Sequence, residues 1–270
     1  MTKDLKIAFI QTALHWENVD ANLKMFTQKI EGITSPIDLV VLPEMFTTGF
    51  SMKSAELAEK MNGKAMQWLA GTASKINAVV TGSVIIEEEG NYYNRLIWMR
   101  PEGTYETYDK RHLFRFANED EHFSAGVKRK IIELKGWRIC PLICFDLRFP
   151  AWSRNMDWIS GNNAKEPVYD CLIYIANWPE ARNSAWKTLL QARAHENQCY
   201  VIGVNRVGED GKNIVYSGDS AVINAKGETL STTNPHEENI EIITLSYKSL
   251  TDFREKFPVS LDADSLKIES

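Results

Sequence analysis

Residues 137–150 have the sequence WRICPLICFDLRFP, and this stretch decides the fold class. Its first part is an apolar run of the kind that forms a strand buried on both faces. Asp146, Arg148 and Pro150 then follow Cys144 and end the strand abruptly. A strand buried on both faces has to be covered by helices on either side, so the stretch predicts an α/β fold.

Two other apolar runs end in the same way. The run DLVVL at 38–42 passes into Glu44 through a single proline. The run DCLIYIA at 170–176 passes into Asn177 and Trp178. Because active sites of α/β sheets gather at the carboxyl ends of strands, we expect the residues that follow these runs to form the functional site.

The rest of the chain alternates strands with helices and shows no linker, low-complexity tract or repeat, which predicts one domain over residues 1–270. Hairpin-like segments in the middle and at the end make the expected sheets mixed. Apolar spacing predicts helices at 22–33, 56–76, 151–160 and 185–197. It predicts further strands at 6–10, 78–87, 92–100, 130–143 (two strands), 200–205, 220–224 and 240–245.

The composition excludes several classes of protein. The 270 residues are 44% hydrophobic and 25% charged, which is ordinary for a globular chain, and the net charge of -5 gives no support to a nucleic-acid or membrane surface. No window approaches the roughly 20 apolar residues of a membrane helix. The start of the chain lacks the pattern of an export signal, and four cysteines are too few for a disulfide scaffold. We therefore expect a cytoplasmic protein with free thiols.

Cys144 is the candidate nucleophile. A cysteine in an apolar run is usually an inert part of the core, because only the thiolate attacks and burial disfavours it. The abrupt strand end after Cys144 favours the other interpretation. On a sharp strand-to-helix turn the sulfur is exposed, and the N–H of Phe145 can point to the same place and bind an oxyanion.

Glu44 and Lys110 are the candidate base and cation. A glutamate directly after a buried strand is costly to desolvate without a purpose, although a helix cap or an exposed turn is the alternative. Lys110 lies in YDKRHLF at 108–114, where a solvated charge is the alternative. Near a cysteine, a carboxylate would accept the thiol proton and an ammonium would stabilise the negative charge of a tetrahedral intermediate. Their spacing along the chain does not by itself bring these side chains together.

In this order, the three motifs resemble the nitrilase, or carbon-nitrogen hydrolase, superfamily, which carries a Glu-Lys-Cys triad. The matching stretches are LPEMFTTGF at 42–50, YDKRHLF at 108–114 and CFDLRFP at 144–150. The likeness extends over nearly the whole chain and includes ANWPEAR at 176–182 and YSGDSAVINAKGE at 216–228. It implies an enzyme with Glu44 as base, Cys144 as nucleophile and Lys110 beside them.

The resemblance also implies an architecture and a fourth residue. The fold would be a four-layer α-β-β-α sandwich of two mixed sheets flanked by helices, without a metal or an organic cofactor. The family's second glutamate usually stands seven residues before a glycine, as Glu119 stands before Gly126, with Glu121 as the alternative. Family members form homodimers or higher homo-oligomers, and the tail from about residue 248 is expected to pack on a partner subunit.

Within the superfamily, the segments NWPEAR, WSRN and FREKFPV resemble omega-amidases. This likeness implies hydrolysis of 2-oxoglutaramate and 2-oxosuccinamate to the 2-oxo diacid and ammonia through a cysteine thioester. The alternatives are a hydrolase of N-carbamoyl amines or other aliphatic amides and, in another class, a non-catalytic binding protein on the same fold. The family often has Tyr where this chain has Phe145, but only the backbone N–H at that position is needed.

Recognition of a 2-oxo acid requires a cation or backbone donors beside the apolar walls of a pocket. Arg148 is one candidate cation, but an ion pair with Asp146 is its simpler role. The favoured candidates for substrate binding, with core packing as the alternative for the aromatic ones, are Phe114, Phe116, Trp178 and Arg182.

A metal is not expected, because His112, His122 and His195 are scattered and no Cys-x-x-Cys pair exists. The nucleotide-binding glycine motifs and the serine-hydrolase motif are also missing from the sequence.

Overall fold

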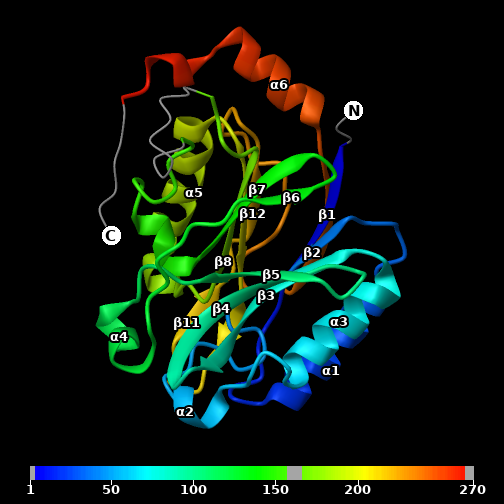
Figure 1. The fold of residues 1–270 in the computed structure, drawn as a ribbon, viewed down its shortest axis with the longest axis vertical. Coiled ribbons are helices and arrows are strands. Elements are labelled where there is room, and N and C mark those ends of the chain that lie inside the picture. The colour runs from blue at the N-terminus through cyan, green and yellow to red at the C-terminus, as the bar shows by residue number, and fades with distance from the viewer. Residues whose placement is uncertain (1–3, 157–165, 265–270) are drawn as a thin grey trace.

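The computed structural model describes residues 4–156 and 166–264. Two sheets lie face to face and helices cover their outer faces, which gives the four layers α-β-β-α (Figure 1). The expected sandwich of mixed sheets is therefore confirmed. No helix among the described residues is long and apolar enough to cross a membrane.

The first sheet has six strands, and β1, β2 and β3 in it are parallel. Its other pairings are antiparallel. In spatial order, the strands are β13 (Asn239–Leu245), β1 (Leu5–Gln11), β2 (Leu39–Val41), β3 (Val79–Glu88), β4 (Asn91–Met99) and β5 (Tyr105–Asp109).

The second sheet has five strands, of which β7, β8 and β9 are parallel. In spatial order, these strands are β12 (Ala221–Ile223), β9 (Tyr200–Asn205), β8 (Cys171–Ala176), β7 (Trp137–Ile143) and β6 (Ile132–Leu134). A separate two-stranded ribbon joins β10 (Val207–Glu209) and β11 (Val215–Ser217).

The helices differ widely in length. The α-helices are α1 (Val19–Glu31), α2 (Ser54–Leu57), α3 (Lys64–Ile76), α4 (Glu119–His122), α5 (Asn183–Asn197) and α6 (Tyr247–Lys256). The short 3₁₀ helices are η1 (Arg115–Ala117), η2 (Cys144–Arg148), η3 (Glu180–Arg182) and η4 (Val259–Asp262).

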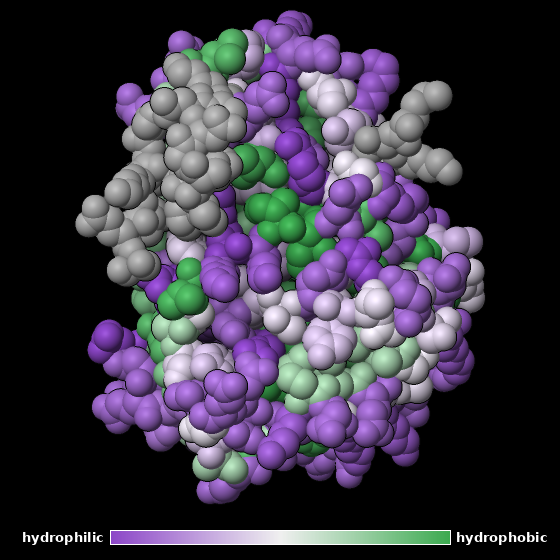
Figure 2. All heavy atoms as spheres, in the orientation of Figure 1, coloured by the Kyte–Doolittle hydropathy of each residue, from purple (hydrophilic) through white to green (hydrophobic). Residues whose placement is uncertain are grey.

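Two apolar layers hold the sandwich together. The larger core lies between the sheets and continues under α5, where Trp186 and Leu190 are fully buried. The smaller core lies between the first sheet and the helices α1 and α3, and it includes Phe26 and Leu69. The face seen in Figure 2 is mostly hydrophilic, with apolar residues gathered toward its middle. Burial of apolar side chains between the layers is the main source of stability for such a fold.

Two expected helices differ from the structure. The helix expected at 56–76 is interrupted, because Glu59 pairs with Ile86 of β3 in an isolated bridge and α3 starts only after Gly63. The carboxylate of Glu59 accepts a hydrogen bond from Ala65 N at 2.8 Å, which caps the new helix. Of the helix expected at 151–160, residues 151–156 form turns and bends and 157–160 lie outside the described residues.

The segment after residue 246 forms α6, which the sequence did not predict. Leu250 is buried in the larger core, and Tyr247 and Phe253 pack against the same core. Figure 1 shows α6 at the end of the sandwich that also carries the N-terminus. The first part of the tail thus packs on its own subunit, while contact of the remainder with a partner subunit stays a prediction.

Candidate active site

Glu44 lies at the carboxyl end of β2, where the chain turns after Leu42 and Pro43. Its side chain is fully buried. Oε1 accepts hydrogen bonds from Asn94 Nδ2 at 2.8 Å and from Lys110 Nζ at 2.9 Å. Oε2 accepts one from the backbone N–H of Asn177 at 2.8 Å. Both oxygens are therefore fixed by donors from other strands, so the carboxylate has a defined orientation.

Lys110 follows directly after β5 and is also buried. Besides Glu44, its ammonium donates to both carboxylate oxygens of Glu119, each at 2.9 Å, and it lies 5.0 Å from the centre of the Phe50 ring. Burial alone would lower the pKa of Lys110, but the charges of Glu119 and Glu44 raise it above its usual value. The lysine is therefore a permanent cation in a nearly dry site.

Glu119 begins the short helix α4 and is buried, whereas Glu121 two residues later is exposed. Phe114 N donates to Glu119 Oε2 at 2.6 Å. Burial raises the pKa of Glu119, while the charge of Lys110 opposes that shift. Of the two glutamates that the sequence left open, Glu119 is the one beside Lys110.

Close packing explains why a glycine, Gly126, stands seven residues after Glu119. Gly126 N donates to Lys110 O at 2.9 Å, so this backbone lies directly on the end of β5. A Cβ atom at Gly126 would lie 2.1 Å from Asp109 O, which no side chain could tolerate. Gly126 thus allows the loop that carries Glu119 to pack closely against Lys110.

Cys144 lies at the junction of β7 and η2, in the left-handed region at φ 44°. Such a conformation is uncommon for a non-glycine residue and is typical of a sharp nucleophile turn. Cys144 is 8% exposed, and its Sγ lies 4.0 Å from Asn177 O. Phe145 is the next residue of η2, and the first N–H groups of a helix have no partner within it.

The surroundings of Cys144 favour the protonated thiol over the thiolate. Burial, followed by the negative charge of Glu44, raises its pKa well above the usual value, and Lys110 opposes this shift. The positive charge of Lys110 therefore does not bring the thiol pKa down to its usual value, because two carboxylates and the dry surroundings outweigh it. A base is needed to form the thiolate at neutral pH.

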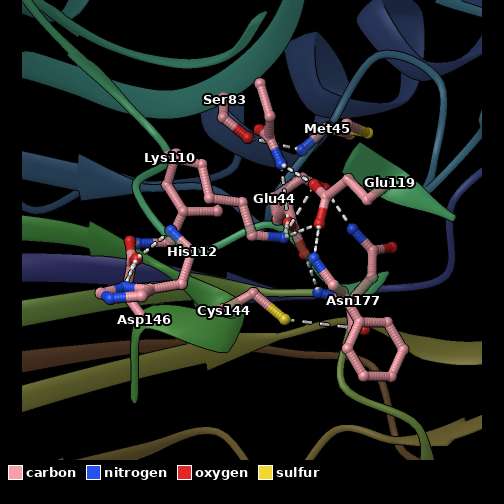
Figure 3. A network of polar contacts seen from close by, with 12 residues as sticks. Glu44, Met45, Ser83, Lys110, His112, Glu119, Cys144, Asp146 and Asn177 are labelled. Atoms are coloured by element: carbon pink, nitrogen blue, oxygen red, sulfur yellow. Dashed lines mark hydrogen bonds and ion pairs between the residues drawn. The ribbon is translucent and has the colours of Figure 1, made fainter. Parts of the chain in front are cut away.

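Asp146 connects the cysteine turn to the lysine loop (Figure 3). Its buried carboxylate accepts from Tyr108 Oη at 2.7 Å, from Ile143 N at 3.0 Å and from His112 N at 3.0 Å. His112 Nδ1 lies 2.8 Å from the same carboxylate, so Nδ1 carries the proton. Asp146 forms none of its hydrogen bonds with Arg148, whose guanidinium instead lies 5.2 Å from the centre of a Trp178 ring.

We expect Asp146→Asn to impair both stability and turnover. An amide presents one donor group to a site that offers only donors, so at least one buried hydrogen bond is lost at about 1–3 kcal/mol of unfolding free energy. A shift of the cysteine turn should lower kcat by up to about 10²-fold with little change in KM. Urea unfolding and steady-state kinetics check this. His112→Gln, which removes one donor only, should be milder, and an Asp146→Asn enzyme with wild-type kcat would contradict this role.

A cavity of about 460 Å³ opens beside Cys144 and Lys110. Cationic groups at its rim belong to Arg148, Arg182 and Lys212. Its apolar walls are formed by Phe50, Phe114, Phe116, Phe145, Trp178 and Tyr216. The candidates Phe114, Phe116, Trp178 and Arg182 thus all line this cavity, which is large enough for a small organic substrate.

The other three cysteines are a natural control for the reactivity of Cys144. All four thiols are free, and Cys140, Cys171 and Cys199 are completely buried in the core. Burial raises the pKa of each of these three, that of Cys140 to about 12. They can react only after local unfolding.

We therefore expect iodoacetamide to modify Cys144 at least about a hundredfold faster than the other three thiols. In Glu44→Gln the reaction at Cys144 should slow, because the thiol loses its base. Peptide mapping by mass spectrometry after timed quenching measures each rate. Four similar rates would contradict the assignment of Cys144 as the reactive thiol.

Three residues of the site could not be identified from the sequence. Asn94 and Asn177 hold the carboxylate of Glu44, and Asn177 Nδ2 also donates to Glu44 O at 2.6 Å. Asn177 stood at a predicted strand end, which was the available signal, whereas Asn94 lies inside β4 with no distinguishing pattern. Asp146 was visible only as a residue that ends a strand. Among the described residues, no cluster of His, Cys, Asp and Glu side chains could hold a metal ion.

Comparison with known proteins identifies the class to which the fold and this site belong. A sequence model described as carbon-nitrogen hydrolase matches residues 6–255, and the chain belongs to that family. It is 45% identical over 264 residues to a protein of Escherichia coli (strain K12) named omega-amidase YafV, with 98% of both chains covered. It is 33% identical over 256 residues to a 2-oxoglutaramate amidase of Bacillus subtilis (strain 168), with 94% and 95% covered.

A solved structure supports the same relationship. XC1258 from Xanthomonas campestris is described as a carbon-nitrogen hydrolase superfamily protein with an arsenic adduct in its active site. It superimposes with a TM-score of 0.93 at 42% identity, and the match covers 98% of this chain and 99% of that one. The protein is thus an enzyme of the carbon–nitrogen hydrolase class, as the motifs around residues 44, 110 and 144 predicted.

Proposed function

We propose that this enzyme is an omega-amidase that hydrolyses the terminal amide of short 2-oxo acid amides, 2-oxoglutaramate and 2-oxosuccinamate, to the 2-oxo diacid and ammonia. The similarity over nearly the full length to proteins named omega-amidase and 2-oxoglutaramate amidase carries the proposal. The buried cluster of Glu44, Lys110 and Glu119 beside Cys144 supports it.

The first half of the proposed reaction forms a thioester. Glu44 takes the proton of Cys144, and the sulfur attacks the amide carbon. Lys110 and the N–H of Phe145 stabilise the oxyanion, a contribution that is typically worth two to three powers of ten in rate for one donor. The intermediate collapses with cleavage of the C–N bond, and protonated Glu44 returns its proton to the departing ammonia.

The second half hydrolyses the thioester. Glu44, again a carboxylate, takes a proton from water as the oxygen attacks the acyl carbon. The C–S bond breaks, the acid leaves, and the proton returns from Glu44 to the sulfur. In this scheme Glu119 holds Lys110, and Asn94 and Asn177 hold Glu44 in the orientation that both proton transfers require.

An ammonia-release assay over a panel of substrates tests the proposal. The panel comprises 2-oxoglutaramate, 2-oxosuccinamate, glutamine, asparagine, an N-carbamoyl amine and an aliphatic nitrile. We expect the two 2-oxo acid amides to have the highest kcat/KM. Release of carbon dioxide together with ammonia from the carbamoyl amine, at a higher kcat/KM, would instead assign the enzyme to N-carbamoyl amines.

We also propose that the enzyme works in the cytoplasm as a homodimer or larger homo-oligomer. The free state of all four cysteines is compatible with a reducing compartment. Phe257 is 61% exposed beyond the end of α6 and is a natural contact for a second subunit. Sedimentation of the wild type and of Phe257→Ser tests this, and a wild-type monomer at micromolar concentration would exclude it.

A further inference from the structure

Three cations at the rim of the active-site cavity form no ion pair within the described ranges, whereas six of the twelve arginines of the chain do. Arg148, Arg182 and Lys212 line the cavity and form no ion pair in the described part of the chain. Lys110 at the base is already paired with Glu44 and Glu119, so the excess positive charge comes from the three cations at the rim, and Asp210 is the acidic residue on the wall. An excess of positive charge in an apolar cleft attracts anionic ligands.

Arg182 is the least exposed of the three cations at the rim. It is half-buried, whereas Arg148 and Lys212 are exposed. Its N–H donates to Pro179 O at 3.0 Å, and its carbonyl accepts from Trp178 Nε1 at 2.8 Å. The backbone of η3 at this residue is thus fixed from both sides, and the side chain starts from a defined position.

The guanidinium of Arg182 lies on two aromatic rings. It is 5.2 Å from the centre of the Phe114 ring and 5.7 Å from that of the Phe116 ring. Stacking uses the faces of a guanidinium and leaves its N–H groups, which lie in the plane, available for a carboxylate. A bidentate arginine–carboxylate pair in such partly dry surroundings is among the stronger polar contacts in proteins.

The aromatic support of Arg182 is tied to the catalytic cluster. Phe114 N donates to Glu119 Oε2 at 2.6 Å, and the same glutamate holds the ammonium of Lys110. The Phe114 ring also contacts that of Phe145, with the centroids 5.0 Å apart. The carboxylate of Glu119 therefore positions the ammonium of Lys110 beside Cys144. It also positions the backbone of Phe114, whose ring together with that of Phe116 forms an aromatic shelf beneath Arg182.

The acidic residue of the wall is already engaged. Asp210 accepts from the backbone N–H groups of Lys212 and Ile214 at 2.8 and 3.0 Å and from Tyr216 Oη at 2.9 Å. Its negative charge is thus shared with three donors and does not compete for the guanidinium of Arg182.

We infer that Arg182 binds the carboxylate at the end of the substrate remote from the amide and selects anionic amides over neutral ones. The inference rests on the proposed amidase function and adds the residue that sets its specificity. The substrate would bridge the cavity, with the amide at Cys144 and the carboxylate on the shelf of Phe114 and Phe116. The substrate class is therefore the terminal amide of a short dicarboxylic acid.

The first test compares an anionic with a neutral amide. kcat/KM is measured for 2-oxoglutaramate and for pentanamide, which has the same carbon-chain length without the charge. In Arg182→Gln we expect a loss of roughly ten- to a hundredfold for 2-oxoglutaramate, mainly in KM, and a far smaller change for pentanamide. Arg182→Lys should lie between, because it keeps the charge without the fork. Arg115→Gln, in η1 between the two phenylalanines but outside the cavity, is the matched control and should match the wild type.

The second test does not depend on turnover. The reaction product 2-oxoglutarate should slow alkylation of Cys144 by iodoacetamide in the wild type and protect Arg182→Gln at least tenfold less well. Protection that depends on Arg182 in an enzyme that hydrolyses no 2-oxo acid amide would refute the proposed function and leave the inference standing. An unchanged preference for the anionic amide in Arg182→Gln, or a selective loss in Arg148→Gln or Lys212→Gln instead, would overturn the inference.

Discussion

Cys144→Ala is expected to abolish ammonia release and to leave the fold intact. Alanine removes the one atom that can form the thioester, and no other thiol lines the described part of the cavity. Loss of a covalent nucleophile typically costs about 10⁴-fold or more in kcat. The substitution removes a single atom at a cavity wall, so the free energy of unfolding should fall by about 1 kcal/mol or less. Ammonia assays and urea unfolding measure the two effects separately.

Two further variants define the specificity of this effect. Cys144→Ser should also be nearly inactive, because a hydroxyl is far harder to deprotonate than a thiol. Cys171→Ala removes an equally small atom from the buried strand β8 and should keep kcat while losing stability. Full activity in Cys144→Ala would remove the basis of the proposed mechanism.

Lys110→Met is expected to have the second-largest effect, and it should act on stability as well as on activity. Methionine preserves much of the length of the side chain but leaves Glu44 and Glu119 buried without the cation that both contact. Removal of one partner from a buried ionic cluster costs about 3–5 kcal/mol of unfolding free energy. Activity should be lost at the same time, because the oxyanion loses its charged donor.

The loss of stability in Lys110→Met should depend on pH. Burial already raises the pKa of Glu119, and removal of the ammonium that opposes this shift raises it further. A carboxyl whose pKa is higher in the folded state binds more protons when folded, so its contribution to stability decreases as the pH rises. The deficit relative to the wild type should therefore be smaller at pH 5 than at pH 8.

Urea unfolding at both pH values checks this prediction. Lys60→Met removes a lysine of the same size whose side chain is 76% exposed, and it should unfold like the wild type at either pH. A Lys110→Met protein with wild-type stability at pH 8 would show that the buried carboxylates do not need the cation.

The strands that decide the fold could be predicted because they are apolar along their whole length. The runs at 38–42, 137–143 and 170–176 became β2, β7 and β8, and the residues after them meet in one place. Parallel strands covered on both faces leave little choice of partner or register. The order of the three motifs around Glu44, Lys110 and Cys144 then indicated the family and the class of reaction.

The lysine strand could not be predicted in the same way. In β5, Tyr105 and four following residues include only one fully buried side chain, that of Tyr108. Such an edge strand has no apolar alternation to identify it, and it is recognised by its pairing with β4. The contact between Lys110 and Glu119 likewise depends on how Gly126 fits against this strand, which is a tertiary effect.

The polar side chains that orient the catalytic residues could also not be predicted from the sequence. Asn94 is one of several asparagines in polar surroundings, and its role appears only when β4 lies beside the end of β2. The break of the helix expected at 56–76 has a similar cause, since pairing of Glu59 with β3 overrides a favourable helical pattern. Tertiary contacts decide both cases, and they override a local helical propensity in the second.

Detection of the acyl-enzyme is the sharpest test of Cys144 as the nucleophile. The wild type is mixed with 2-oxoglutaramate, quenched in acid during turnover and analysed by intact mass and peptide mapping. We expect one 2-oxoglutaryl group in place of the thiol proton on the peptide that contains Cys144, and no such adduct in Cys144→Ala. Ammonia release without any adduct on Cys144, together with turnover by Cys144→Ala, would contradict this role.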